Sequence, residues 1–284
     1  MTGLPVTLRE STLHRFSLGS TGPRDEERTA NVLVTGFEAQ AFGTNCYVLA
    51  TGPGEQCVVV DPGIGVLTRL DAVLAEHRLH PAAVLLTHGH LDHTFSVAPV
   101  CDARGVTAYI HPADRELLAD PAKGLSMDVT QLFGGRLPYT EPDDVAELPD
   151  GGTITVAGLE ITVNHAPGHT GGSVLFRLPG GDTAKLASRT TDSTGNRIDD
   201  VPPAELCLSG DVLFAGSIGR TDLPGGSMEA MLLSLRDKIL PLDDATVVLP
   251  GHGPATTIGR ERATNPYLLE VIDATTGPPG KIAT

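Results

Sequence analysis

The stretch LLTHGHLDHT, from Leu85 to Thr94, places three histidines and an aspartate within six positions, directly after an aliphatic run. In an extended backbone alternate side chains point to the same side, so His88 and His90 would share one direction. Asp92 and His93 follow where the chain turns into a helix, and they can face the same cavity from the other side. The pattern therefore predicts two adjacent sets of metal ligands, which a polar loop leaving the core would not need.

Three later segments carry the same kinds of side chain. HAPGH contains His165 and His169, SGD contains Asp211, and PGHG contains His252. Each segment follows an expected strand, and Asp211 offers a carboxylate that can bridge two cations. Imidazole nitrogen and carboxylate oxygen are ligands that suit zinc, iron or manganese.

The alternation of apolar residues and turn signals predicts strands along most of the chain. Strands are expected over residues 31–35, 46–50, 57–61, 82–87, 106–110, 153–156, 160–164, 173–178, 207–211 and 246–250, and helices over 66–77, 94–103 and 228–240. The strand, helix, strand order around LLTHGHLDHT favours a parallel crossover, and open α/β sheets place ligands at the carboxyl ends of their strands. We therefore expect an α/β fold, an αββα sandwich of two mixed β-sheets with helices on the outer faces.

A single domain is expected over residues 31–270, between a polar N-terminal extension at 1–30 and a C-terminal tail at 271–284. A polar insertion at 184–205 interrupts this domain, because its composition cannot bury much apolar surface. The stretch at 117–144 is rich in Gly, Pro and Asp, and it is a candidate cover over a substrate.

Composition and charge limit the partners. A formal charge of −15 repels phosphate backbones and anionic lipid headgroups, so we expect neither nucleic acid nor a membrane as a partner. The N-terminus shows no apolar run of signal-peptide type, which favours a cytoplasmic protein. Cys46, Cys57, Cys101 and Cys207 form no CxxC pair, and we expect four reduced, largely buried thiols.

The motifs HxHxDH, PGHT, GD and PGHG occur in this order over roughly Asn31 to Tyr267, and together they resemble those of the metallo-β-lactamase superfamily. The resemblance implies two divalent metal ions, zinc first, with iron or manganese as alternatives. By position, one ion would be held by His88, His90 and His169 and the other by Asp92, His93 and His252, with Asp211 between them. Asp92 and Asp211 would also serve catalysis, and Asp61, in VDPG, would support the ligands.

Within the superfamily, the segment from Gly210 to Gly226 (GDVLFAGSIGRTDLPGG) is similar to short-form glyoxalase II-like, or hydroxyacylglutathione hydrolase-like, enzymes. This resemblance implies hydrolysis of a thioester, such as S-lactoylglutathione or an analogue, to a hydroxy acid and a free thiol. Lactamases that use a cysteine ligand carry it where this chain has Asp211, which argues against penicillin-type substrates.

The segments that would bind the thiol depart from the glutathione-specific pattern. A Lys and a Tyr of that pattern are missing after Asp211, where this chain has Arg220 and Asp222, and a Tyr is missing after His252. Arg220 is a candidate for holding a substrate carboxylate, or it forms an ion pair with Asp222 that shapes the loop. The expected partner is thus a small-molecule thioester whose low-molecular-weight thiol stays open.

The main alternative within the same fold is a persulfide dioxygenase. Such enzymes use one iron, which His88, His169 and Asp211 would hold here. A serine hydrolase built on AGSIG lacks the first glycine of the GxSxG elbow and leaves HxHxDH unexplained. The oligomeric state is left open by the sequence.

Overall fold

The computed structural model describes residues 32–125, 135, 138–180 and 205–276. The first part of the chain forms one mixed six-stranded sheet in the order β1-β2-β3-β4-β5-β6. Its strands are β1 (Leu33–Glu38), β2 (Asn45–Ala50), β3 (Gln56–Val60), β4 (His80–Leu85), β5 (Thr107–Ile110) and β6 (Val145–Glu147). The first three strands are antiparallel, and β3 to β6 run parallel because helical crossovers or a long excursion connect them.

The second part forms another mixed six-stranded sheet, in the order β12-β11-β10-β9-β8-β7. Its strands are β7 (Thr153–Val156), β8 (Leu159–His165), β9 (Val174–Pro179), β10 (Glu205–Gly210), β11 (Val247–Pro250) and β12 (Thr256–Thr257). The turn between β7 and β8 has positive φ at Ala157 and Gly158, which matches the twist of a tight hairpin. Among the described strands of this second sheet, only β10 and β11 pair in parallel, and this pair carries two of the loops that reach the site.

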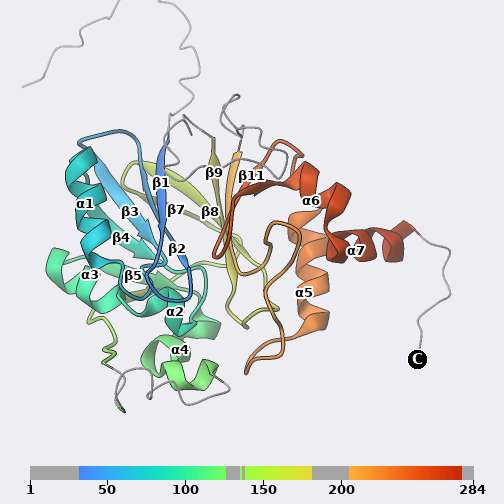
Figure 1. Cartoon of the computed structure of the whole chain (residues 1–284), viewed down its shortest axis with the longest axis horizontal. Helices are drawn as coiled ribbons and strands as arrows, with labels where there is room; N and C mark the ends of the chain where they lie inside the picture. The colour runs from blue at the N-terminus through green and yellow to red at the C-terminus, as the bar shows by residue number, and fades with distance from the viewer. Residues whose placement is uncertain (1–31, 126–134, 136–137, 181–204, 277–284) are drawn as a thin grey trace, which may run out of the picture.

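Helices cover the outer face of each sheet (Figure 1). Beside the first sheet lie α1 (Leu67–His77), α2 (Leu91–Thr94), α3 (Val97–Arg104) and α4 (Arg115–Ala119), with 3-10 turns at Pro112–Asp114 and Pro121–Gly124. Beside the second lie α5 (Met228–Ser234), a π-helical turn at Leu235–Ile239, α6 (Ile258–Thr264) and α7 (Pro266–Thr276). No helix in the described ranges is apolar over enough length to reach across a bilayer.

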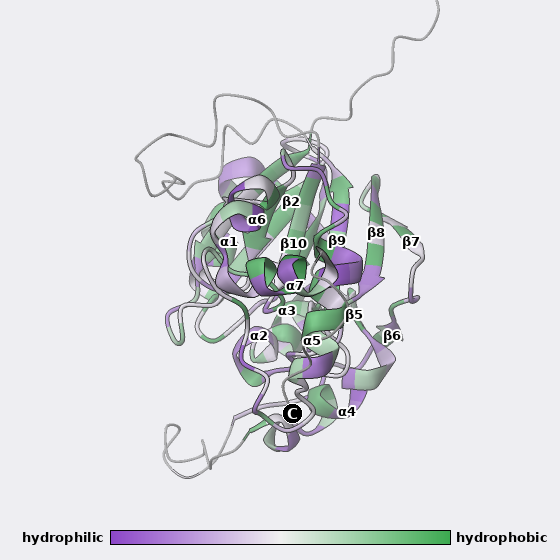
Figure 2. Ribbon diagram, turned by 90° about the vertical axis from the view of Figure 1, so that its right-hand side faces the viewer, coloured by the Kyte–Doolittle hydropathy of each residue, from purple (hydrophilic) through white to green (hydrophobic). Residues whose placement is uncertain are grey.

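The core divides into three apolar layers that follow the strand period of two. Along β3, Cys57 and Val59 pack toward the helices of the first sheet, while Val58 and Val60 pack between the sheets. The third layer, with Leu175 and Leu235, lies between the second sheet and its helices. Figure 2 shows the central strands β2 and β10 as mostly hydrophobic. The predicted αββα sandwich of two mixed β-sheets is therefore confirmed, and the four cysteines are free and buried as expected.

The expected helix over 94–103 is wrong in its bounds. The chain forms α2 from Leu91, breaks, and resumes as α3 at Val97. The break occurs because the backbone N–H of Ser96 donates to Pro62 O at 2.9 Å and its hydroxyl donates to Gly63 O at 2.6 Å. As a result, Asp92 and His93 lie on a helix of their own, directed by the loop after β3.

Other boundaries also shift. The helix expected over 228–240 begins as predicted, with Ser227 capping Ala230 N at 3.2 Å, but its second half is the π-helical turn. Helix α7 continues through Thr276, past the expected domain end at residue 270, because Val271 packs in the third layer. Glu205, expected to end the polar insertion, begins β10 and pairs with Pro179. Three predicted segments lie wholly or partly outside the described residues. They are the extension at 1–30, the insertion at 184–205 up to residue 204, and residues 126–134 and 136–137 of the 117–144 stretch.

Candidate metal centre

The histidine and aspartate side chains predicted from the sequence meet at one edge of the sandwich. The four loops that supply them follow β4, β8, β10 and β11 at their carboxyl ends. Seven residues form three overlapping groups whose ligand atoms all lie within 4.8 Å of one another in each group: His88, His90, Asp92, His93, His169, Asp211 and His252. Such groups could hold metal ions.

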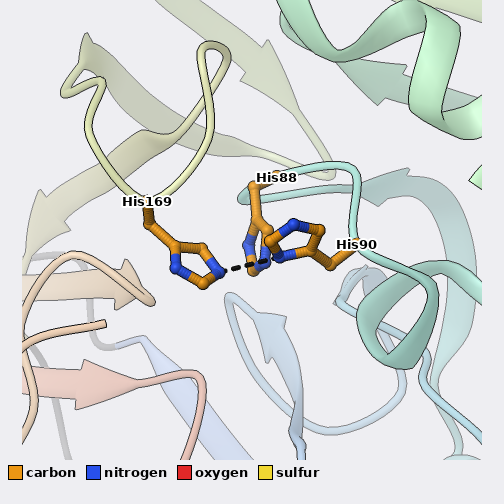
Figure 3. A group of neighbouring side chains, drawn as sticks. All are labelled: His88, His90 and His169. Carbon is orange, nitrogen blue, oxygen red and sulfur yellow. Dashed lines mark hydrogen bonds between the residues drawn. The ribbon is translucent and has the colours of Figure 1, made fainter. Parts of the chain in front are cut away.

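The first group consists of three histidines, two from the loop after β4 and one from the loop after β8 (Figure 3). The rings of His88 and His90 have centroids 4.9 Å apart, and the ring of His88 lies 4.7 Å from that of His169. The His90 Nδ1 atom is 2.8 Å from His169 Nε2. The loop after β4 belongs to the first sheet and the loop after β8 belongs to the second. The group therefore forms only when the two sheets pack face to face.

The second group contains Asp92 and His93 from α2 and His252 from the loop after β11. Asp92 Oδ2 lies 3.1 Å from His252 Nε2, and the Nε2 atoms of His93 and His252 are 3.3 Å apart. This group is also built from both sheets.

Asp211 lies between these two groups and forms the third group with His88 and His93. Its Oδ2 atom is 3.5 Å from His169 Nε2 of the first group and 3.6 Å from His252 Nε2 of the second. Its Oδ1 atom is 3.4 Å from His93 Nε2. One carboxylate thus faces ligand atoms of both groups.

In four of the five histidines, the ring nitrogen that faces away from the site has an oxygen partner. His88 Nδ1 meets Thr87 Oγ1 at 3.1 Å and His93 Nδ1 meets Asp61 Oδ2 at 2.9 Å, while His169 Nδ1 meets Arg220 O at 2.7 Å and His252 Nδ1 meets Phe42 O at 3.1 Å. A proton on Nδ1 satisfies each of these oxygens, which leaves Nε2 with a lone pair directed into the site. Outer hydrogen bonds of this kind fix the tautomer and orientation of ligating histidines.

Asp61 supports the site, as its position in VDPG suggested. Its Oδ1 atom accepts from Thr87 N at 2.8 Å and its Oδ2 atom accepts from the Thr87 hydroxyl at 2.6 Å. Thr87 and Thr44, which donates to Asp92 Oδ2 at 3.0 Å, were not predicted from the sequence. In the sequence, Thr87 could have been suspected only because it directly precedes the expected ligand His88. Nothing in the sequence near Thr44 indicated a role in the site.

Buried polar atoms without partners fit a cation. Among the described residues, His88 Nε2 and Asp211 Oδ1 are buried atoms that lack a hydrogen-bond partner. Leaving buried polar atoms unpaired is costly in free energy. Since both atoms belong to the groups above, a bound cation would satisfy them, and the donor set of imidazole nitrogen and carboxylate oxygen suits divalent zinc, iron or manganese.

Electrostatics divide the site into two halves. Burial and the neighbouring His169 lower the pKa of His90 to about 4, and burial together with His93 holds the pKa of His88 well below its usual value. Burial also opposes the charged form of His93, but the carboxylates of Asp92, Asp211 and Asp61 outweigh it and raise its pKa well above the usual value. The neutral forms of His88 and His90 are thus favoured, whereas the protonated form of His93 is favoured.

The two carboxylates of the site stay ionised. Burial would raise the pKa of Asp92 and of Asp211, but His93 and His252 outweigh burial and lower both values.

Glycine is required at position 251, beside these side chains. A Cβ atom on Gly251 would overlap Asp211 Oδ1 and lie 2.7 Å from His93 Cε1. The late PGHG motif therefore supplies both a histidine and the space for its neighbours.

Arg220 contributes its backbone to the site, while its side chain points to solvent. Its carbonyl accepts from His169, and its guanidinium, 60% exposed, forms an ion pair with Asp222 through hydrogen bonds of 2.7 and 2.8 Å. The ion pair considered from the sequence is present. His165 lies outside the three groups, with its Nε2 atom 2.7 Å from Gly171 O and its ring stacked on His111.

Comparison with known proteins places this arrangement in a family. The model of the metallo-β-lactamase superfamily matches residues 39–184, about half of the chain. The chain belongs to the metallo-β-lactamase superfamily. The match includes the loops of His88 and His169, and the loops of Asp211 and His252 follow it along the chain.

Several curated proteins are similar to this chain over most of their length. An uncharacterised protein of Mycobacterium tuberculosis is 48% identical over 84% of this chain and 98% of its own. The probable metallo-hydrolase YqgX of Bacillus subtilis is 33% identical, covering 79% and 92% of the two chains. The hydroxyacylglutathione hydrolase GloC of Haemophilus influenzae is 32% identical, covering 80% and 94%.

Several solved structures share the fold. The B3 metallo-β-lactamase BLEG-1 is 34% identical with a TM-score of 0.65, over 83% of this chain and 99% of its own. TTHA1623, solved in a di-iron-bound form, is 34% identical with a TM-score of 0.61, over 82% and 99%. ETHE1 from Myxococcus xanthus, at 21% identity and a TM-score of 0.61 over 87% and 92%, shows the fold alone.

Proposed function

We propose that this protein is a dinuclear metal-dependent hydrolase and that its substrate is a thioester of a low-molecular-weight thiol. The observation that carries the proposal is the position of Asp211, whose two oxygens face His169 of one ligand group and His93 of the other at 3.5 and 3.4 Å. A carboxylate in this position can serve two cations at once, and paired cations are a common basis for hydrolysis.

The ligand assignment follows the two groups. One cation would be held by His88, His90 and His169, the other by Asp92, His93 and His252, and Asp211 would contact both. When bound, such a pair of divalent cations supplies a hydroxide nucleophile at neutral pH and Lewis acidity toward a carbonyl oxygen. Zinc is the first choice for this donor set, and TTHA1623 in its di-iron form keeps iron as an alternative beside manganese.

Asp92 and Asp211 are the proposed catalytic carboxylates. Both remain ionised because His93 and His252 lower their pKa values against the effect of burial. An ionised carboxylate accepts hydrogen bonds only, so it can orient an attacking water by accepting from it. Thr44 donates to Asp92 Oδ2 and so keeps the rotamer of that side chain fixed.

A thioester suits this site because its leaving group needs little help. The pKa of a thiol is about 8.5, so a thiolate can leave near neutral pH without a strong general acid. The part of the site that the structure describes contains carboxylates that stay ionised and histidines directed at cations, and neither is placed as a proton donor to an amine.

The proposed substrate class rests on two further observations. GloC, at 32% identity, is named a hydroxyacylglutathione hydrolase. The backbone carbonyl of Arg220 contacts His169 of the site. The guanidinium of Arg220 is exposed, so a substrate carboxylate could displace Asp222 and bind it. S-lactoylglutathione has both the thioester and free carboxylates, which belong to its glutathione part. The lactoyl thioester of another small thiol could contact Arg220 in this way only if that thiol carries a carboxylate.

The comparisons make β-lactams a second substrate class to test. The sequence argued against penicillin-type substrates because no cysteine ligand stands at Asp211, yet BLEG-1, at 34% identity, is described as a B3 metallo-β-lactamase. The hydrolysis of a β-lactam differs in its amine leaving group, so it belongs in the same assay as the thioesters.

The alternative, a mononuclear iron persulfide dioxygenase, has its three ligands in the site. His88 and His169 lie in the first group, and Asp211 Oδ2 lies 3.5 Å from His169 Nε2. The second group of Asp92, His93 and His252 favours the dinuclear hydrolase, because a mononuclear enzyme would have no use for it.

The test is a substrate panel on the full chain, loaded separately with zinc, iron(II) and manganese. Lactoyl thioesters of glutathione, coenzyme A and a cysteine-based thiol are assayed for thiol release, beside a chromogenic cephalosporin and oxygen uptake with glutathione persulfide. We expect thiol release from at least one thioester well above that of the chelator-treated protein. Oxygen uptake without thioester hydrolysis, or turnover of the cephalosporin alone, would overturn the proposal.

A further inference from the structure

Asp114 is a buried carboxylate that is absent from the ligand groups. It ends the 3-10 turn Pro112–Asp114, which follows β5 in the first sheet, and its exposed fraction is 1%. Burying a carboxylate is costly unless hydrogen bonds or charges compensate. The position therefore requires an explanation.

Three donors from two separate loops compensate the carboxylate. Its Oδ2 atom accepts from Gly89 N at 2.8 Å and from the Thr170 hydroxyl at 2.6 Å, and its Oδ1 atom accepts from Gly172 N at 2.7 Å. Gly89 lies between His88 and His90, and Thr170 directly follows His169. These are the two loops whose histidines face each other in Figure 3.

The backbones approach Asp114 closely because both loops carry glycine at the contact. A Cβ atom on Gly172 would lie 2.6 Å from Asp114 Cγ, and one on Gly89 would lie 3.1 Å from Asp114 O and 2.7 Å from Leu117 Cβ. The HGH and HTGG segments thus provide glycine at the points where they contact this carboxylate.

We infer that Asp114 is a positioning residue that sets the separation between the His88-Gly89-His90 segment and His169, and thereby the cation affinity of the three-histidine group. One side chain joins a loop of the first sheet to a loop of the second, directly beside ligands on both. Asp114 acts through Gly89 and Thr170. The inference rests on the proposed cation binding and is independent of the thioester.

Substitutions at Asp114 and Thr170 separate positioning from general stability. Asp114→Asn keeps the shape but replaces one acceptor oxygen by an amide that faces a donor. Thr170→Val removes one of the three hydrogen bonds with no change in shape, and Thr170→Ser retains the hydroxyl. Changes in groups that orient ligands typically weaken metal affinity about 10- to 100-fold. We expect Asp114→Asn to fall in this range, Thr170→Val to show a smaller loss, and Thr170→Ser to stay near wild type.

Glu261 provides a matched control. It is also a fully buried carboxylate with three donors, Gly216 N, the Thr256 hydroxyl and Asn265 Nδ2. None of these donors belongs to the loop of His88 and His90 or to the loop of His169. Glu261→Gln should therefore lower the free energy of unfolding in a similar way and leave zinc affinity close to wild type.

The experiment measures zinc affinity of the full chain by competition with a chromophoric chelator, together with the visible spectrum of the cobalt(II)-loaded protein. The predicted result is weaker zinc binding and an altered cobalt spectrum in Asp114→Asn but not in Glu261→Gln. Equal affinities and spectra in wild type and folded Asp114→Asn would overturn the inference. If Asp114→Asn does not fold, equal affinities of Thr170→Val and Thr170→Ser would overturn it. A wild-type protein that binds no zinc, iron or manganese would instead overturn the proposed function, and the positioning role with it.

Discussion

The Nδ1 atom of His93 lies 2.9 Å from the Oδ2 atom of Asp61. The same oxygen accepts the Thr87 hydroxyl at 2.6 Å, and that hydroxyl meets His88 Nδ1 at 3.1 Å. A single carboxylate from the loop after β3 therefore orients one histidine of each ligand group. Asp61 has a positive φ of 49°, a conformation that aspartate and asparagine adopt more readily than most residues.

Replacement of Asp61 tests this link. Asp61→Asn keeps the backbone conformation and the shape, but the lost charge weakens the hold on His93 and Thr87. We expect total metal affinity to fall about 10- to 100-fold, measured by chelator competition. Asp71→Asn, at an exposed carboxylate that pairs with Arg104, is the control for the lost charge, and an equal loss in both variants would contradict the role of Asp61.

The bridging position of Asp211 predicts different metal contents for two alanine variants. Asp211→Ala removes the carboxylate that faces both groups, so we expect this variant to lose both cations. His252→Ala removes a ligand of the second group and should leave close to one cation per chain. Elemental analysis of the purified variants measures this, and two cations retained in Asp211→Ala would contradict the bridging role.

The pKa directions predict that the two cations bind with different pH dependence. The pKa of His93 is raised above its usual value, so its ring is protonated below that raised pKa, and a cation must displace the proton. The affinity of the second group should therefore fall as the pH falls below that raised pKa. Because burial and His169 lower the pKa of His90 to about 4, the first group should retain its cation to a clearly lower pH.

Calorimetry of zinc binding in buffers of different ionisation enthalpy measures the protons released at each step. We expect the step with the higher affinity at about pH 6 to release fewer protons than the other. Equal proton release at both steps would show that the electrostatic difference between the groups has no effect on binding.

Arg220 should affect substrate binding more than turnover. Its side chain is exposed and only its carbonyl holds His169, so Arg220→Ala leaves the ligands in place. For a thioester with a free carboxylate we expect KM to rise by about 10-fold with kcat little changed. Asp222→Ala frees the guanidinium and should lower KM or leave it unchanged. A KM for Arg220→Ala equal to wild type would mean that the ion pair serves only the loop.

Much of the fold and the ligand set could be predicted from the sequence because both follow local patterns. Continuous apolar runs along β3 and β4 indicated buried strands, and HxHxDH places two candidate ligands in extended backbone and two on a helix. The parts that failed depend on distant contacts: α2 and α3 separate because Ser96 bonds to Pro62 and Gly63. Strands β6 and β12 have three and two residues, too few for a period to be recognised.

The residues around the ligands were harder to predict for the same reason. Asp114 has no motif of its own, and its partners Gly89 and Thr170 come from two sheets. The partner of His252 is the carbonyl of Phe42, and a backbone acceptor leaves no trace in residue type. Local sequence patterns do not determine four further properties. The metal identity, the small-molecule thioester partner and the cytoplasmic location remain predictions, and the oligomeric state was left open.

The proposed hydrolysis depends on two cations, and removing and restoring the metal measures that dependence. The full chain is stripped with a chelator and titrated with zinc while thiol release from a lactoyl thioester is followed. We expect no release without metal and a rise that is complete only near two equivalents per chain. Full activity in the stripped protein, or at one equivalent with no further rise, would contradict it.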